Sequence, residues 1–196
     1  MPEIALPDIA RSWRLFLIQE EAARNYWRSY LMYGLHSHRD PLLDRILPSL
    51  LYIKAVTILD DALRTLIATR GLRMPKRYPD SLAGRIDFLA DGDILDNRAE
   101  FHRVRLRRNE LAHETASEVT WEELTRDRAA VHGWLLNLGL VVPPTKLEFY
   151  CERSAMRAST REGYDHERDF EYGIKENGKL ALQIAWKEFI GGAGSS

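Results

Sequence analysis

The spacing of the apolar residues changes near residue 143, and this change constrains the fold more than any other feature of the sequence. Before it, apolar residues recur at steps of three and four positions, which is the pattern of amphipathic helices. After the VVPPT stretch at 141–145, apolar and polar residues alternate as they do in strands with one buried face. We therefore predict a mainly α protein, with a helical bundle at 1–143 followed by a small antiparallel sheet at 144–190.

The helical part divides into about five segments. The second contains the stretch LLYIKAVTILDDALRTLI, which is apolar nearly all round and predicts a central helix packed against several others. Asp60 and Asp61 lie in this stretch, where a charge needs a partner or an opening to solvent. Thr120 with Glu123 forms a capping box for the last helix. The expected helices cover about 8–35, 41–70, 82–90, 95–113 and 121–138.

The β part contains a clear hairpin signal. Asn177-Gly178 stands between two runs of β-forming residues, as in a type I′ turn. We expect three antiparallel strands near 146–156, 169–175 and 179–188, which need to pack on helices or on a partner because three strands alone are marginal. The GGAGSS tail at 191–196 has the composition of a flexible linker.

Composition excludes several classes of protein. Lys and Arg number 28 against 29 Asp and Glu, so no overall positive field indicates a nucleic-acid binder, and any charge-driven function is local. A single cysteine, Cys151, permits neither an internal disulfide nor a thiolate metal site. The beginning of the chain lacks a signal-peptide pattern, and no stretch is apolar enough for a membrane helix. We expect a cytoplasmic protein that does not contact a membrane.

The densest basic stretch precedes the sequence RRNELAHE. Five arginines and one acid, Glu100, lie within 98–108, and Asn109 and His113 follow one helical turn apart. Arginine clamps phosphate with two donors, and histidine exchanges a proton near neutral pH. Together they can cut RNA without a metal by assisting attack of the 2′-hydroxyl on phosphorus. The candidates are therefore Arg108 and His113 for catalysis, Asn109 in support, and for substrate binding Arg103, Arg105 and Arg107.

Other readings of these residues remain open. An arginine-rich helix face is often only a solvated surface, and Asp60 or Asp61 can pair with nearby cations. His36 and His38, with Asp40 nearby, can be proposed as metal ligands, although such a loop more often faces solvent. No phosphate-binding glycine loop or hydrolase motif is present. We therefore expect neither a metal nor a cofactor.

The stretch Arg108-Asn109-Glu110-Leu111-Ala112-His113 resembles the R-x4-6-H signature of the HEPN superfamily, in which a polar residue typically follows the arginine. A bundle of four or five helices, with this motif late and an acidic residue on an earlier helix, is similar to the HEPN plan over about 8–140. The resemblance implies a metal-independent endoribonuclease completed by a symmetric homodimer. Arg108 and His113 would be catalytic, and Asp60 or Asp61 would tether the arginine.

The resemblance also implies a role as a toxin or as an antiviral or stress defence effector, with an antitoxin or defence-system protein as a partner. Many HEPN toxins that pair with a nucleotidyltransferase antitoxin carry a tyrosine two residues after the histidine, where this chain has Thr115. The alternative is a non-catalytic HEPN-like module that binds RNA or a protein. The β region is not part of the HEPN plan.

Overall fold

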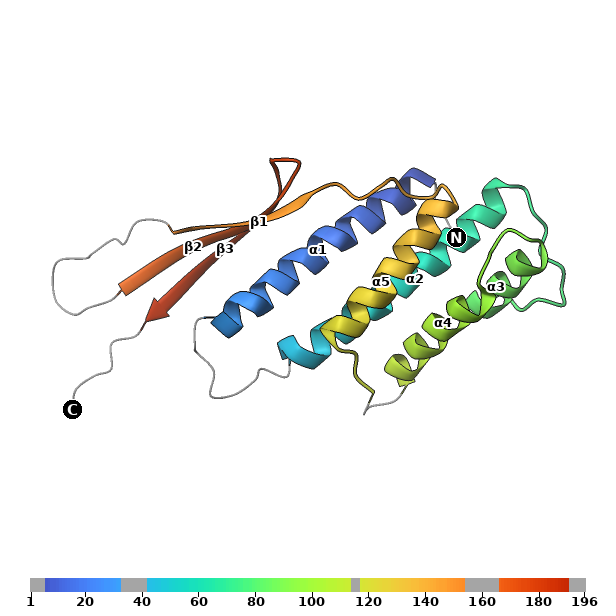
Figure 1. Ribbon diagram of the computed structural model, residues 1–196, viewed down its shortest axis with the longest axis horizontal. Coiled ribbons are helices and arrows are strands. Elements are labelled where there is room, and N and C mark those ends of the chain that lie inside the picture. Colours follow the sequence, from blue (N-terminus) through green and yellow to red (C-terminus); the bar gives the residue numbers. More distant parts are fainter. Residues whose placement is uncertain (1–5, 33–41, 114–116, 154–165, 191–196) are drawn as a thin grey trace. The chain divides into compact units, whose positions relative to one another are not determined.

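The computed structural model confirms a mainly helical chain that ends in a three-stranded antiparallel sheet (Figure 1). It describes residues 6–32, 42–113, 117–153 and 166–190. Within these ranges, none of the helices is long and apolar enough to cross a membrane. The elements are α1 (Leu6–Met32), the π-helical turn η1 (Leu42–Ile46), α2 (Leu47–Thr69), α3 (Leu82–Asp91), α4 (Arg98–His113), α5 (Trp121–Asn137), β1 (Leu147–Arg153), β2 (His166–Glu176) and β3 (Lys179–Ile190).

Contacts divide the chain into two compact units. One unit comprises residues 1–17 and 29–143, and the other comprises residues 18–28 and 144–196. The division after residue 143 is where the apolar periodicity changes. The second unit also takes part of α1, which the sequence pattern assigns to the helical bundle.

Helix α2 is the centre of the helical unit. It contacts α3, α4 and α5, as expected for a helix that is apolar on nearly every side. Leu59, Ala62 and Leu63 are completely buried. The expected central helix is therefore present, and any polar group on α2 must find a partner on a neighbouring helix or an opening to solvent.

Side-chain caps fix the beginnings of two helices. The Ser81 hydroxyl accepts a hydrogen bond from the Gly84 amide at the start of α3, and the Thr120 hydroxyl accepts one from the Glu123 amide at the start of α5. Helix α4 begins at Arg98, three residues later than the sequence pattern predicts. Asn97 adopts a positive φ of 60°, which breaks the helix before that point.

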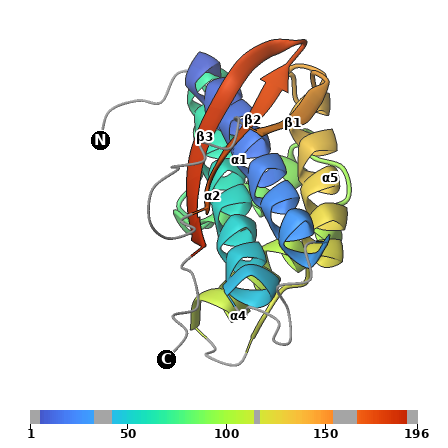
Figure 2. The same ribbon diagram turned by 90° about the vertical axis from the view of Figure 1, so that its left-hand side faces the viewer.

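The second unit has the strand order β1-β2-β3, and Figure 2 shows β2 between the other two. Asn177 and Gly178 form the expected tight turn, with φ values of 50° and 76° that match a type I′ turn. Ile174 of β2, which is paired with Phe149 and Leu182, packs with Ile18 and Ala22 of α1. This contact meets the expectation that the strands pack on a helix.

Gly173 lies beneath an aromatic side chain of the neighbouring strand. A Cβ at this position would lie 2.1 Å from the Tyr150 ring. Glycine therefore allows the ring to cover β2, where Lys175 also lies over its face at 4.6 Å.

Candidate functional site

The arginines of α4 divide into two groups by their partners. Arg98, Arg103 and Arg107 form ion pairs with acidic residues of α3, α4 and α5. Arg105 and Arg108 instead line a cleft. This division separates arginines that hold the bundle together from arginines that are available to a ligand.

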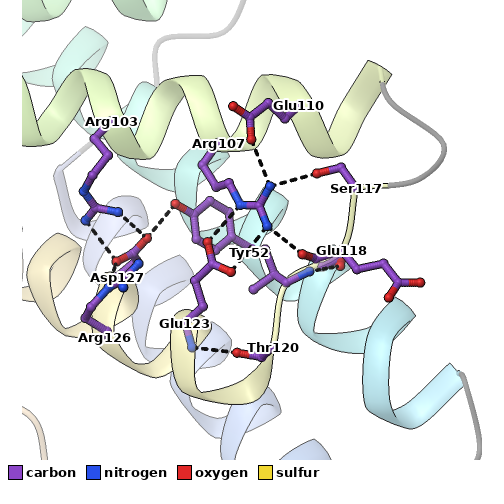
Figure 3. Close-up of polar contacts among 12 residues, drawn as sticks. Tyr52, Arg103, Arg107, Glu110, Ser117, Glu118, Thr120, Glu123, Arg126 and Asp127 are labelled. Carbon is purple, nitrogen blue, oxygen red and sulfur yellow. Dashed lines mark hydrogen bonds and ion pairs between the residues drawn. The ribbon is translucent and has the colours of Figure 1, made fainter.

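Arg103 belongs to a hydrogen-bonded network around the buried carboxylate of Asp127 (Figure 3). Its guanidinium donates to both Asp127 oxygens, at 2.9 and 3.0 Å, while the Tyr52 hydroxyl donates to the same carboxylate at 2.9 Å. Burial acts to raise the pKa of Asp127, but hydrogen bonds from Arg103, Arg126 and Tyr52 outweigh it and lower that pKa to about 2. Arg103, which the sequence suggests for substrate binding, thus joins α4 to α5 through an acid of the protein itself.

Arg107 joins α4 to the beginning of α5 and to the segment before it. It donates to the carboxylates of Glu123 and Glu110, at 2.8 and 2.9 Å, to the Ser117 hydroxyl at 2.8 Å and to the Glu118 carbonyl at 2.6 Å. The hydrogen bond with Glu123 contributes most to raising the pKa of Arg107. Arg107, which the sequence also suggests for substrate binding, is thus occupied by partners within the protein.

A cleft of about 390 Å³ lies between α2, the beginning of α3 and α4. We call it the arginine cleft. Its charged residues are four arginines and two aspartates, a formal excess of two positive charges. Among the lining residues, none is aromatic. The charged residues are Asp60, Arg64, Asp80, Arg85, Arg105 and Arg108, and the others are Val56, Thr57, Ser81, Leu82, Ala83 and Asn109.

Arg85 is the most buried cation of the cleft, with a side chain that is only 4% exposed. It donates to Asp60 through two nitrogens, at 2.6 and 2.8 Å, and to Asp80 at 2.6 Å. Two carboxylates therefore neutralise this guanidinium. Asp60, one of the two acids that the HEPN resemblance suggests as a tether for Arg108, pairs with Arg85. A nitrogen of Arg64 lies 3.8 Å from the other Asp60 oxygen.

A glycine allows the loop before α3 to lie close to that helix. A Cβ on Gly84 would lie 2.0 Å from the Pro79 carbonyl oxygen, so no other residue fits without moving the backbone. This loop carries Asp80, one of the two acids that bind Arg85. The close approach at Gly84 thereby helps to form one wall of the cleft.

Arg105 and Arg108 differ from the other cations of the cleft. Within the part of the chain that the structure describes, neither forms an ion pair. Arg108 donates a long hydrogen bond of 3.4 Å to the Asn109 side chain, and the Nε of Arg105 is buried without a hydrogen-bond partner. A buried donor without an acceptor is costly, so a ligand that supplies acceptors here would bind favourably.

His113 ends the described part of α4, and its side chain is exposed. It lies outside the set of residues that line the cleft. It follows Asn109 by four positions and therefore lies on the same helix face, one turn beyond the cleft. Asp61 also lies outside that set and pairs with Arg64 at 3.4 Å.

Four residues weighed in the sequence, His36, His38, Asp40 and Thr115, fall outside the described residues. Among the residues that the structure does describe, no group of three or more His, Cys, Asp or Glu side chains is placed to hold a metal ion.

The sequence did not single out Arg64, Asp80 and Arg85 as cleft residues. Asp80 lies in the loop before a short helix, and Arg85 lies within that helix, which has no distinctive motif. Arg85 stands at a position of α3 where the apolar pattern predicts a buried residue. A buried arginine needs an acidic partner, and this is the signal in the sequence that could have indicated an ion pair there.

Comparisons of the chain with models of protein families, with curated proteins and with solved structures found no match. The chemistry of the site must therefore be argued from the geometry of the chain itself.

Proposed function

We propose that the protein is a metal-independent endoribonuclease whose substrate phosphate binds at Arg108. The observation that carries this proposal is the division of the α4 arginines: Arg105 and Arg108 have no ion-pair partner among the described residues and line one cleft. Permanently charged, forked donors of this kind suit phosphate oxygens. The near-zero net charge of the chain agrees with a small, focused phosphate site.

The proposed reaction needs a charge stabiliser and a proton-transfer group. The substrate 2′-hydroxyl attacks the phosphorus, the bond to the 5′-oxygen breaks, and the products are a 2′,3′-cyclic phosphate and a 5′-hydroxyl. Arg108 stabilises the additional negative charge on the phosphoryl oxygens. His113, about 7.5 Å further along the helix axis, accepts the proton from the 2′-hydroxyl or donates one to the leaving oxygen.

A homodimer would supply a second His113, so that one imidazole accepts the proton while the other donates it. This arrangement follows from the HEPN resemblance. The same resemblance supports a role as a toxin or defence effector, with an antitoxin or defence-system protein as a partner. Induced expression should then arrest growth of the host cell, and His113→Ala should relieve the arrest at equal protein level.

The test of the reaction is cleavage of RNA in the presence of EDTA, with analysis of the product ends. We expect cyclic phosphate and 5′-hydroxyl ends, and His113→Ala should abolish cleavage while the circular dichroism spectrum stays helical. The matched control is His102→Ala, because His102 bonds to Asp87 of α3 and lies outside the cleft. Cleavage that requires a metal, or that survives His113→Ala, would refute the proposal.

A second candidate function is RNA binding without cleavage. The observation that favours it is the exposure of His113 outside the cleft, which leaves Arg108 as the only member of the catalytic pair among the residues lining it. Salt-sensitive binding of RNA that depends on Arg108, together with intact RNA after long incubation, would select this function.

A further inference from the structure

Two features of Arg105 mark it as a ligand-binding residue distinct from Arg108. Its Nε is buried and has no hydrogen-bond partner, and its side chain lines the cleft three positions before Arg108 on α4. Residues three apart share a helix face, about 4.5 Å apart along the axis. Arg105 and Arg108 therefore both contribute to the α4 wall of the arginine cleft.

Ion pairs occupy two of the four cleft arginines and leave the other two for a ligand. Arg85 pairs with Asp60 and Asp80, at 2.6 Å in each case, and Arg64 lies 3.4 Å from Asp61. Arg105 and Arg108 pair with no acid among the described residues. A phosphodiester carries one negative charge, so two successive phosphates of a nucleic acid strand match these two arginines.

The remaining walls of the cleft indicate how such a strand is recognised. The lining residues include no aromatic side chain on which a base could stack. A volume of about 390 Å³ is small for a nucleic acid duplex but sufficient for a short stretch of one backbone. The cleft therefore favours a single strand that is recognised by its phosphates rather than by its bases.

We infer that Arg105 forms a second phosphate subsite, which holds the phosphate adjacent to the scissile one at Arg108. The inference rests on the proposed ribonuclease function and specifies its substrate: single-stranded RNA with at least two successive phosphates, cut with little dependence on base sequence. Arg105 is a substrate-binding residue in this scheme, and Arg108 and His113 remain the residues at the reacting phosphate.

The test compares three short RNA substrates. NpN has one phosphate, whereas pNpN and NpNp carry a second one on either side of the scissile bond. In the wild type, one of the two longer substrates should have a kcat/KM about tenfold above NpN, because one charge-assisted contact contributes about that factor. Arg105→Gln should remove this advantage, so that kcat/KM becomes similar for the three substrates. Arg73→Gln removes an equal charge from an exposed loop and should preserve the advantage.

Binding of a 2′-O-methyl oligonucleotide, which cannot be cut, measures the subsite without catalysis. Arg105→Gln should lower the affinity about tenfold and reduce the slope of log K against log salt by about 0.7, the value for one phosphate contact on a single strand. Arg105→Lys keeps the charge but loses the buried Nε donor, so it should retain the slope and recover only part of the affinity. If Arg105→Gln fails to fold, Arg105→Lys provides the test of the subsite in its place.

The outcomes separate the two proposals. Binding that depends on Arg105 without cleavage of any substrate would refute the ribonuclease and support the subsite. If RNA is cleaved but Arg105→Gln keeps the advantage of the longer substrates, the subsite is refuted and the ribonuclease proposal stands. The same holds if Arg105→Gln lowers kcat/KM equally for all three substrates. Unchanged affinity and salt slope in Arg105→Gln would also overturn the subsite.

Discussion

Replacing Asp127 by asparagine tests whether the arginine-rich helix is held in place by its own ion pairs. The Asp127 side chain is 1% exposed and receives hydrogen bonds from Arg103, Arg126 and Tyr52. Its pKa falls from an ordinary value of 3.8 to about 2. At 1.36 kcal/mol per pKa unit, the ionised carboxylate contributes about 2 kcal/mol to the free energy of unfolding.

The decrease in the free energy of unfolding caused by Asp127→Asn should be close to this figure. Removing one member of a fully buried ion pair costs about 3–5 kcal/mol, because the remaining charge is left without solvent. Here the side chains of Arg103 and Arg126 are 39% and 63% exposed, so water can hydrate both guanidinium groups. We therefore expect a decrease of about 2–3 kcal/mol in the free energy of unfolding at neutral pH.

The pH dependence provides an independent check. A carboxylate whose pKa is lowered in the folded state stabilises the fold above its unfolded pKa, and that contribution is lost as pH falls through the folded pKa. The difference between wild type and Asp127→Asn should thus be complete above about pH 5 and shrink toward pH 2.

Urea unfolding followed by far-ultraviolet circular dichroism, repeated across this pH range, measures both effects. Glu122→Gln is the matched control, because Glu122 is an exposed acid on the same helix. A loss below about 0.5 kcal/mol at neutral pH, or a difference that does not shrink in acid, would refute the reasoning.

Three further predictions concern single positions. His132 accepts a hydrogen bond from the Trp13 indole at 2.7 Å. Burial, followed by repulsion from a nearby arginine, lowers the pKa of His132 below its ordinary value of 6.5. The free energy of unfolding should therefore fall as pH drops below 6.5, because the unfolded chain binds a proton at His132 more readily. This fall should be absent from urea titrations of His132→Gln. Gly173→Ala should lower the free energy of unfolding by about 1–3 kcal/mol through collision with Tyr150, measured by thermal melting, and unchanged melting would contradict that packing. Gly84→Ala should be more damaging, since the new Cβ meets a backbone oxygen rather than a movable ring, and a soluble variant with wild-type stability would contradict the close approach.

The sequence predicted those parts of the fold that local rules determine. Apolar spacing identified the helices, and the capping box at Thr120 identified the beginning of α5. Asn177-Gly178 identified the hairpin turn. The start of α4 was placed too early because the positive φ of Asn97 interrupts a pattern that continues in the sequence.

The functional division of the arginines could not be predicted in the same way. Arg103 and Arg105 are two positions apart and look equivalent in the sequence. Which of them meets an acid depends on Asp127, which comes 24 residues after Arg103 and lies on another helix. The role of Arg85 likewise depends on Asp60, 25 residues earlier. Such pairings arise from helix packing, and a single sequence does not record them.

We propose that Arg105 and Arg108 act on RNA, while the other arginines of α4 support the bundle. The most direct test is kcat/KM on single-stranded RNA for five arginine-to-glutamine variants, normalised to the folded fraction of each. We expect Arg108→Gln to lower kcat/KM by at least about a hundredfold and Arg105→Gln to lower it about tenfold. Three variants should match the wild type per folded molecule: Arg98→Gln, Arg103→Gln and Arg107→Gln. Normalised activity that falls as far in Arg103→Gln or Arg107→Gln as in Arg108→Gln would contradict the proposal.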